Sequence, residues 1–590
     1  MKKLSLLIPA LCLLFAIQAC QTQDTPNIII LITDDQGYGD LGYHGNPYIL
    51  TPHLDQFAQE AVSFTNFHVS TTCAPTRGAL MTGRHTNRLN VFHTIAGRSL
   101  LFEDELILPQ VLGANGYTCG MFGKWHLGDN YPFRPEDRGF HEVVRHGGGG
   151  IVQLPDYWGN DYFDDTYWHN SNPREYKGYC TDVFFEEAMR FIEDHKDEPF
   201  FCYLSTNAPH GPLNVPMEYV DKYRDMDQVP ERLKRFYGMI TNIDDNFKKL
   251  ESQLERLGLK ENTLLIFMTD NGTALGHTLY GGGMRGNKGS EYDGGHRVPF
   301  MLRWPEGNIG GGKKVEKLTA HYDVLPTLAD LLDLEFTPKK PLDGSSLVPL
   351  LKGENESWPN RILYMDTQRD LELEKYKRYS VMDETWRLVN GDELYQIDLD
   401  PDQDSNLIAE YPEVAARLAE GYELWWQSIM DEEVDKRFAY IQAGSPSENP
   451  VRVCSHDLLS PVFQFWHQWH PVNATEGSGV WKIEIVSEGD YTFSLRRFPR
   501  ESGWGFNDSF PAEPRPDRLE SSMPESKQVG IIEASLEIGE FSQRESIKMD
   551  ADELTFDAHL QKGKYDMKAI LMDQDGKVHP AYFVYIEKVK

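Results

Sequence analysis

Two uninterrupted apolar runs, far apart in the chain, set the strongest limit on how this sequence can fold. Residues 27–33 (NIIILIT) are followed by Asp34 and Asp35, and residues 264–269 (LLIFMT) by an Asp-Asn pair. Apolar runs without polar alternation are typical of strands that are buried on both faces of a parallel sheet. They predict an α/β fold with a mixed, mostly parallel central sheet flanked by helices.

The side chains that follow these two runs predict a metal site. They are Asp34, Asp35, Asp270 and Asn271. In open α/β sheets ligands bind beyond the carboxyl ends of the strands, so these side chains are expected to converge. Three carboxylates that lie so close together repel one another unless a cation lies among them. All-oxygen ligation suits calcium or magnesium rather than zinc. Any one of these acids alone is better explained as a cap or turn residue.

Two more apolar runs end in cationic residues and point to the same edge of the sheet. Residues 117–123 lead into Lys124 and His126, and residues 199–205 lead to His210. A histidine at such a place can exchange protons near neutral pH. Taken singly, each lysine is more often a solvated surface charge and each histidine a structural one. Their position at strand ends favours a role in the shared site.

The segment 73–84, CAPTRGALMTGR, carries the most specific motif of the chain. Pro75 fixes its own backbone and biases Ala74 toward an extended conformation. Residues 78–82 are expected to be helical, which places Cys73 near a helix N-terminus, where backbone N–H groups favour an anion. The segment resembles the C-x-P-x-R, then x-x-L-x-T-G-R signature of type I, formylglycine-dependent sulfatases of the alkaline phosphatase-like superfamily. A buried structural cysteine is the alternative for Cys73.

The resemblance implies that a formylglycine-generating maturation enzyme converts Cys73 to Cα-formylglycine. A thiol would stop at a stable adduct with sulfur, whereas the hydrated aldehyde carries two hydroxyls, one to attack sulfur and one to expel sulfate. The resemblance also implies calcium as the metal, with the residue-73 side chain joining the four strand-end ligands. The further catalytic residues that it implies are Arg77 to orient the hydrate, Lys124 and Lys288 to hold sulfate, His126 to take a proton from the hydrate, and His210 to protonate the leaving oxygen.

These residues predict a sulfuric ester hydrolase that removes sulfate from a sulfated carbohydrate, acting on the chain end of a glycan. Two loops, 84–98 and 156–169, combine aromatic and polar residues that suit a sugar ring. The residues expected to contact substrate are His93, Arg98, Trp158 and His169. A phosphonate or phosphodiester hydrolase of the same superfamily and a catalytically inactive glycan-binding lipoprotein are the alternatives. The intact nucleophile, histidines and metal ligands argue against the inactive one.

The 590 residues are too many for one ordinary domain. We expect a catalytic domain at 26–360, a small α+β subdomain at 361–440 that resembles the sulfatase C-terminal subdomain, a polar linker at 441–452 and an accessory β-sandwich at 453–590.

The role of the expected β-sandwich is open. A carbohydrate-binding module would suit an enzyme that acts on a polymer. The aromatic cluster of this domain, Trp466, His467, Trp469 and His470, can equally pack against the catalytic domain and shape its pocket. Aromatic residues at a domain junction are usually core, which favours the packing role.

The N-terminus has the pattern of a signal peptide of the lipoprotein type, at residues 1–19. Two lysines precede an apolar stretch, 4–17, that is shorter than the ~20 residues needed to span a bilayer. The residues before Cys20 resemble a bacterial lipobox, with 20–25 as a tether. We therefore expect an exported bacterial protein, periplasmic or anchored in the outer membrane, that touches lipid only through this anchor. Simple secretion is the alternative, because Gln18 is unusual at its position.

The formal net charge of −33 argues against nucleic acid as a partner. It does not conflict with an anionic substrate. Salt screens distant surface charge over about 8–10 Å, while cations that line a cleft act at contact range.

Overall fold

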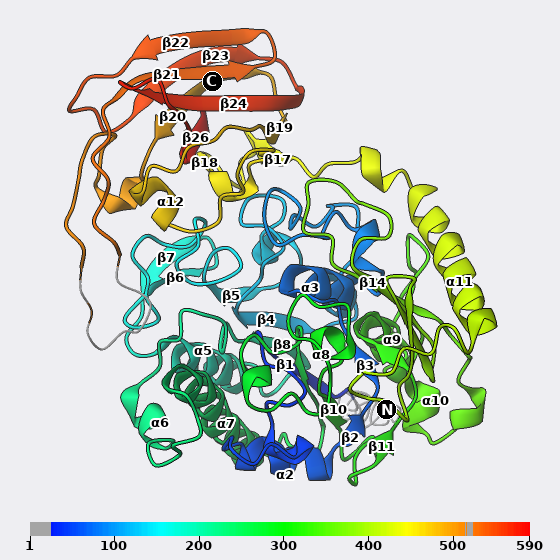
Figure 1. Ribbon diagram of the computed structural model, residues 1–590. Coiled ribbons are helices and arrows are strands. Elements are labelled where there is room, and N and C mark those ends of the chain that lie inside the picture. Colours follow the sequence, from blue (N-terminus) through cyan, green and yellow to red (C-terminus); the bar gives the residue numbers. More distant parts are fainter. Residues whose placement is uncertain (1–24, 514, 516–522, 590) are drawn as a thin grey trace, which may run out of the picture.

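A ten-stranded sheet forms the centre of the molecule in the computed structural model, which describes residues 25–513, 515 and 523–589 (Figure 1). The strand order is β11-β2-β10-β9-β1-β8-β4-β5-β6-β7. Four central strands run parallel to one another: β9 (Thr263–Thr269), β1 (Asn27–Thr33), β8 (Phe200–Ser205) and β4 (Thr118–Gly123). Next to them, β5 (Glu142–Arg145) is parallel to β4, while β10 (Phe300–Arg303) is antiparallel to β9. The predicted mixed, mostly parallel sheet is confirmed.

Strand β1 shows why the apolar runs carry no polar alternation. Ile29 and Leu31 point into a core under three helices, α2 (Pro52–Glu60), α5 (Cys180–Asp194) and α7 (Glu231–Leu257). Their neighbours Ile28, Ile30 and Ile32 point into a second core under α3 (Cys73–Thr82), α4 (Leu108–Ala114) and α9 (Val324–Leu331). Because both faces are covered, every residue of the strand is buried.

A smaller antiparallel sheet follows in the chain. Its four strands are β13 (Leu363–Asp366), β14 (Tyr379–Met382), β15 (Trp386–Val389) and β16 (Glu393–Gln396). Helix α11 (Pro412–Met430) covers one face through a core that includes Leu418 and Tyr422. This subdomain packs beside the large sheet, on the right of Figure 1.

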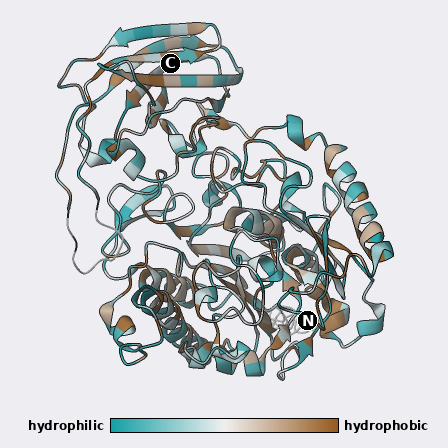
Figure 2. Ribbon diagram, in the orientation of Figure 1, coloured by the Kyte–Doolittle hydropathy of each residue, from teal (hydrophilic) through white to brown (hydrophobic). Residues whose placement is uncertain are grey.

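The C-terminal β domain consists of two sheets around one core. The first holds β17 (Ile441–Ala443), β19 (Trp481–Ile485), β24 (Gly563–Asp573), β21 (Ile531–Ile538) and β22 (Phe541–Ser546), with β25 (Val578–Pro580) paired to β24. The second holds β18 (Val451–Cys454), β26 (Phe583–Lys588), β20 (Gly489–Arg496) and β23 (Leu554–Leu560). Buried residues alternate with partly buried ones along the second half of β24, and Figure 2 shows the hydropathy of this strand changing in bands.

The expected linker at 441–452 is wrong, because β17 and the first half of β18 lie within it. Ile441 pairs with Ile483 in one sheet and Val451 with Ile586 in the other, and Ile441 and Val451 are almost fully buried. The polar Gly-Ser-Pro stretch between the two strands is a turn that carries the chain from sheet to sheet. The domain thus begins at 441.

The β domain shares its core with the catalytic domain. Leu100, Phe102, Phe133 and Leu154 of the catalytic domain belong to the same apolar cluster as the inner residues of both β sheets. Within the described residues no helix is long and apolar enough to cross a membrane. The expected signal peptide and nearly all of the tether, residues 1–24, lie outside the described part and stay predictions.

Candidate active site

The acids that follow β1 and β9 meet at the carboxyl edge of the large sheet. Thr33 and Thr269 are direct partners in the parallel ladder, so the residues after them are adjacent. The backbone N–H of Asp35 donates to Asp270 at 3.2 Å, and the side-chain amide of Asn271 donates to Asp35 at 2.9 Å. Asp35 has a φ of 67°, a left-handed conformation that a residue other than glycine adopts only under constraint.

The donor set at this edge fits a hard cation. Oδ1 of Asp34 and Oδ1 of Asn271 are buried and have no hydrogen-bond partner among the described residues, which is costly unless another group pairs with them. Burial raises the pKa of Asp34, and burial together with the charge of Asp34 raises the pKa of Asp270 to about 6. Ligand atoms of Asp34, Cys73 and Asp270 lie within 4.8 Å of one another. Oxygen donors in this number suit calcium or magnesium.

Cys73 is the first residue of helix α3 and is only 3% exposed. One turn later, Arg77 is held by three strand ends. Its Nε and Nη2 donate to Asp270 Oδ2 at 3.1 and 2.8 Å, and its Nη1 donates to the carbonyl of Lys124 at 3.0 Å and to the hydroxyl of Ser205. This fork fixes the N-terminal turn of α3, and with it Cys73, against the acidic cluster.

Two lysines, Lys124 buried and Lys288 partly buried, reach the same acids from different elements. Nζ of Lys124, just after β4, lies 2.6 Å from Asp34, and Nζ of Lys288, in a glycine-rich loop, lies 2.5 Å from Asp35. Burial opposes the charge on both lysines, but the neighbouring carboxylates outweigh it and raise their pKa values. For Asp35, burial is likewise outweighed, because Lys288 and His210 hold its pKa well below its usual range. The site therefore holds fixed cations beside residue 73.

His126 offers a free basic nitrogen. Its Nε2 lies 2.8 Å from the carbonyl of Thr94, so Nε2 carries the proton and Nδ1 is left as a buried acceptor with no hydrogen-bond partner in the described structure. Burial, followed by the charge of Lys124, lowers its pKa well below the usual value. The imidazole is neutral and suits the role of proton acceptor.

His210 presents the opposite nitrogen. Its Nδ1 lies 2.7 Å from the carbonyl of Gly211, and its Nε2 faces the acidic cluster, 3.9 Å from Asp35. Burial lowers the pKa of His210 to about 4, although Asp35 opposes the shift. The negative charge of a bound anion would raise this pKa and favour the protonated form.

Glycines make room for both histidine rings. A Cβ on Gly149 would lie 2.2 Å from Cε1 and 2.3 Å from Nε2 of His126, and one on Gly150 would lie 3.2 Å from the ring of His210. The backbone N–H of Gly149 donates to the side chain of Gln153 at 2.8 Å, which holds the loop in place. Sequence reasoning missed these residues, although the run of four glycines at 147–150 was a visible signal.

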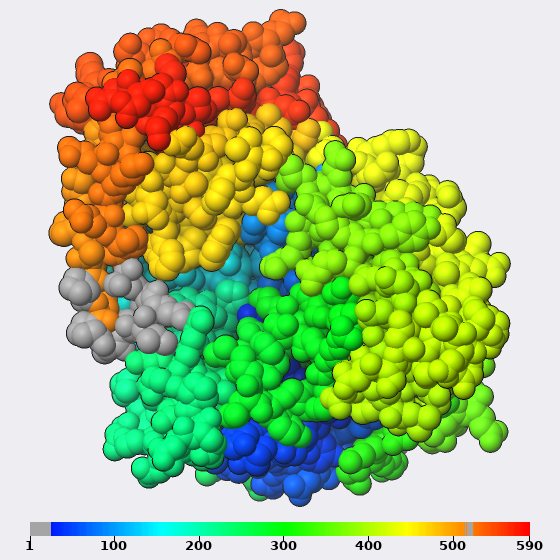
Figure 3. All heavy atoms as spheres, viewed as in Figure 1, coloured from blue at the N-terminus to red at the C-terminus, as the bar shows by residue number. Residues whose placement is uncertain are grey.

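A cavity of about 1240 Å³ opens above Cys73. His126, His210 and Lys288 share its floor with Cys73, and its walls come from residues 93–95, 369–374 and 460–466. On the face shown in Figure 3, a hollow lies between the yellow C-terminal residues and the green subdomain, with blue residues beneath. The arrangement can bind an anion against cations and move protons on two sides of it.

Comparison with known families decides the identity. Residues 26–334 match the family model described as Sulfatase, and residues 287–423 match the model described as N-sulphoglucosamine sulphohydrolase, C-terminal. The first match alone spans more than half of the chain. This chain belongs to the sulfatase family.

Individual relatives agree with this assignment. The sulfatase is 30% identical over 406 residues to the N-acetylgalactosamine-6-sulfatase of Mus musculus, covering 64% of this chain and 75% of the relative. It is 32% identical over 372 residues to arylsulfatase A of Homo sapiens, covering 58% and 70%. A crystal structure of Ps i-CgsB in complex with k-i-k-neocarrahexaose superposes with a TM-score of 0.63 at 27% identity, covering 70% of this chain and 95% of that one. The enzyme is a sulfuric ester hydrolase.

Of the four residues expected to contact substrate in this sulfatase, the cavity contains His93. Nδ1 of His93 accepts from the backbone of Thr94 at 2.6 Å, and its Nε2 lies 3.0 Å from Oε1 of Gln464. Arg98 is buried behind the wall, where it donates to the carbonyl of Leu371 at 2.7 Å and to Asn90 at 2.7 Å. Arg98 thus supports the cavity loop at 369–374 instead of reaching the substrate.

Trp158 and His169 of the sulfatase also lie away from this cavity. Trp158 packs edge-on against Phe498 of the β domain and lines a separate cavity of about 290 Å³. His169, at the end of β6 (Thr166–His169), lies 3.0 Å from the hydroxyl of Tyr176. Trp158 thus faces the domain junction, whereas His169 lies on β6, next to the edge strand β7 of the large sheet.

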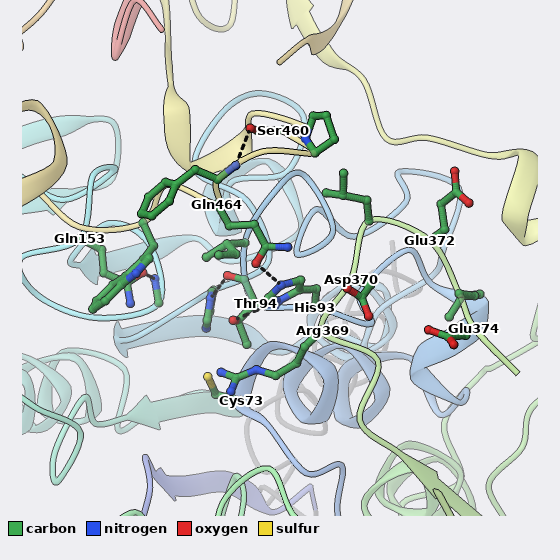
Figure 4. Close-up of a pocket in the computed structure, with 18 of the residues that line it drawn as sticks. Cys73, His93, Thr94, Gln153, Arg369, Asp370, Glu372, Glu374, Ser460 and Gln464 are labelled. Atoms are coloured by element: carbon green, nitrogen blue, oxygen red, sulfur yellow. Dashed lines mark hydrogen bonds between the residues drawn. The ribbon is translucent and has the colours of Figure 1, made fainter. Parts of the chain in front are cut away.

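Sequence reasoning missed the outer walls of the site. Arg369 is exposed in the loop after β13, and its side chain extends toward Cys73 (Figure 4). Gln464 and Trp466 come from the β domain. No residue spacing or sequence motif predicts that these residues line the cavity, because their positions depend on how the three domains pack together.

Proposed function

We propose that this sulfatase removes sulfate from a sulfated carbohydrate, with formylglycine formed at Cys73 and a bound calcium ion. The observation that carries the proposal is the position of Cys73, which lies at the floor of the cavity among strand-end acids, two lysines and two histidines. Asp34, Asp35, Asp270 and Asn271 would hold the cation together with residue 73.

The residues divide the work of sulfate-ester hydrolysis between them. A hydrated aldehyde at residue 73 supplies one hydroxyl to attack sulfur and a second to expel sulfate, and calcium, when bound, supplies positive charge to the ester oxygens. Lys124 and Lys288 stabilise the other sulfonyl oxygens. His210 gives a proton to the departing alcohol oxygen. His126 accepts the proton of the remaining hydroxyl at its free Nδ1.

Two observations support a carbohydrate substrate. Ps i-CgsB, which shares this fold at 27% identity, was crystallised with a neocarrahexaose. The cavity of about 1240 Å³ also exceeds the roughly 300–1,000 Å³ typical of small-ligand sites, so there is space for sugar rings beyond the sulfated one.

Mass spectrometry and kinetics on one preparation test the proposal. The chain is produced with a formylglycine-generating enzyme, and the peptide around Cys73 is expected to show the mass change of cysteine-to-formylglycine conversion. Hydrolysis of p-nitrophenyl sulfate is expected to fall with EGTA and to return with calcium. Cys73→Ala is expected to lower the rate on the order of 10³-fold or more, because the nucleophile is lost.

Cys119→Ala, which changes a buried thiol in β4, is the matched control and should keep most of the activity. Faster cleavage of bis-p-nitrophenyl phosphate than of the sulfate would favour the phosphodiesterase alternative. Full activity with an unmodified Cys73 would overturn the mechanism.

A further inference from the structure

One wall of the active-site cavity belongs to a domain that neither family model covers. The matches end at residue 423, whereas Ser460, Phe463, Gln464 and Trp466 line the cavity from the β domain. They face the subdomain loop at 369–374, as Figure 4 shows with Ser460 and Gln464 on one side and Asp370 and Glu372 on the other. These two walls flank the cavity above Cys73.

The β-domain wall is fixed to the catalytic domain by backbone hydrogen bonds. The carbonyl of Trp466 accepts from the N–H of Leu154 at 2.9 Å, and the N–H of Gln468 donates to the carbonyl of Val152 at 3.1 Å. The side chain of Gln468 is buried and donates to the carbonyl of Gln153 at 3.2 Å. The wall is therefore part of the site and not a separate module on a tether.

A side-chain contact also links the wall to the catalytic loop. Nδ1 of His93 accepts from the backbone of Thr94, so its Nε2 carries the hydrogen and donates to Gln464 at 3.0 Å. The neighbouring Thr94 is the residue whose carbonyl holds His126. Gln464 is thus linked to the proposed base, His126, through His93 and Thr94.

Aromatic side chains stay open to the cavity on this wall. Trp466 is 41% exposed and Phe463 is 38% exposed, although both are large apolar groups. Trp466 contacts His467 and His470 edge-on at ring distances of 5.0 and 6.0 Å, which holds its plane. An aromatic ring fixed in a wet cavity suits the apolar C–H face of a sugar.

The opposite wall carries three carboxylates as well as Arg369. Asp370, Glu372 and Glu374 line it, and Asp370 and Glu374 are both paired with Lys377. Arg369 extends toward Cys73, so its charge lies near the reacting sulfate group. Carboxylates accept strong hydrogen bonds from hydroxyl groups and repel sulfate. Beside these carboxylates, the space between the walls favours a ring that carries hydroxyls rather than a second sulfate.

We propose that the C-terminal β domain completes the substrate site, with Trp466 as the platform for an unsulfated sugar ring next to the sulfated one. This inference rests on the proposed sulfated-carbohydrate substrate. It makes the enzyme selective for oligosaccharides over single sulfated sugars. Gln464 supports the platform by holding His93.

Comparing substrates of different length tests the platform. Wild type and Trp466→Ala are assayed on p-nitrophenyl sulfate, on the 6-sulfates of galactose, N-acetylgalactosamine and glucosamine, and on sulfated di- and tetrasaccharides that contain them. We expect wild type to prefer the longer sugars. Trp466→Ala should lower kcat/KM for them by about ten- to hundredfold and lower it much less for the aryl sulfate, which has no second ring.

Trp469→Ala is the matched control, because Trp469 is equally exposed on the same domain but lines the separate cavity beside Trp158. It should leave the preference for length intact. Equal losses on all substrates in Trp466→Ala, or no gain from a second ring in wild type, would overturn the inference. Failure of wild type to cleave even the aryl sulfate would instead count against the proposed function.

Discussion

At the scale of single residues, the site is organised by buried ion pairs whose partners come from distant segments. Arg77 pairs with Asp270, Lys124 with Asp34 and Lys288 with Asp35, and five of these six side chains are at most 5% exposed. Loss of one partner from a buried pair leaves an uncompensated charge. The same contacts that orient the cations toward substrate therefore hold the strand ends together.

At Gly149, a larger side chain should lower the catalytic rate by more than it lowers the stability of the fold. In Gly149→Ala the new methyl group would overlap the ring of His126, so either the ring or the loop must move. We expect kcat to fall on the order of 10²-fold, since small misplacements of catalytic groups have effects of this size. The free energy of unfolding should fall by about 1–3 kcal/mol, as for other overpacked sites.

Steady-state kinetics and thermal unfolding of the same samples measure both effects of Gly149→Ala. Gly113→Ala, in helix α4, is the control, because its Cβ would have only one ordinary contact, 3.8 Å from His141. Unchanged kcat in Gly149→Ala would contradict the expectation that the added methyl group displaces the His126 ring.

The sequence alone was enough to predict that the residues after the buried strands come together. Buried strands appear in the sequence as continuous apolar runs, and the carboxyl ends of parallel strands meet at one edge of the sheet. Cys73 was predictable from its motif. Arg369 and Gln464 were not predictable. The catalytic-domain residues that they approach lie about 280 or more positions away in the sequence, and no local sequence pattern indicates such a contact.

At the scale of elements, the error at 441–452 has a simple physical origin. Glycine, serine and proline favour turns whether the turn joins two domains or two strands of one sandwich. A turn within a sandwich differs from a linker in the burial of its flanking residues, such as Ile441 and Val451. The sequence did not show this burial, because strands of three or four residues are too short to show polar–apolar alternation.

Strand β15 attaches the small subdomain to the catalytic domain through Arg387. This fully buried side chain donates to Asp293 at 2.9 Å and to the side chain of Asn66 at 3.0 Å. In Arg387→Met the carboxylate of Asp293 stays buried without its main partner. We expect the free energy of unfolding to drop by about 3–5 kcal/mol near neutral pH.

The pH dependence of this loss gives a sharper test. Burial opposes the charge of Asp293, but Arg387 first, and then His68, His296 and Arg297, outweigh it and hold the pKa below its unfolded value, so the carboxylate stabilises the fold above that value and the contribution is lost as pH falls. In Arg387→Met the largest of these opposing charges is gone, so the pKa of Asp293 should rise toward the value that burial favours, and the variant should lose less stability than wild type on acidification. Urea unfolding measured from about pH 8 to about pH 5 should show that the difference in free energy of unfolding between wild type and Arg387→Met becomes smaller.

Adding Asp293→Asn to Arg387→Met is the control, because it removes the charge that would otherwise be stranded. The double variant should recover part of the stability at neutral pH and lose the pH trend. A gap that stays constant over the whole pH range would contradict this account.

At the scale of the whole molecule, the β domain and the catalytic domain cannot be treated as separate bodies. A chain that ends at residue 440 would expose the four catalytic-domain residues of the shared core, which are Leu100, Phe102, Phe133 and Leu154. Exposed apolar patches of this kind promote association. We expect the truncated chain to form aggregates or to unfold at a lower temperature than the full-length protein.

Size-exclusion chromatography and circular dichroism of both chains, prepared in parallel, measure this effect. The full-length chain is the control for expression and handling. A monomeric truncated chain with an unchanged melting temperature would show that the shared core contributes little.

The hydrogen bonds between residues 152–154 and 466–468 have a practical consequence for enzyme engineering. They place a surface of the β domain beside the reaction centre without making it part of segment 73–84. A combinatorial library at Phe463, Gln464 and Trp466 can therefore be screened for altered substrate preference while every member keeps the proposed catalytic and metal-binding positions unaltered.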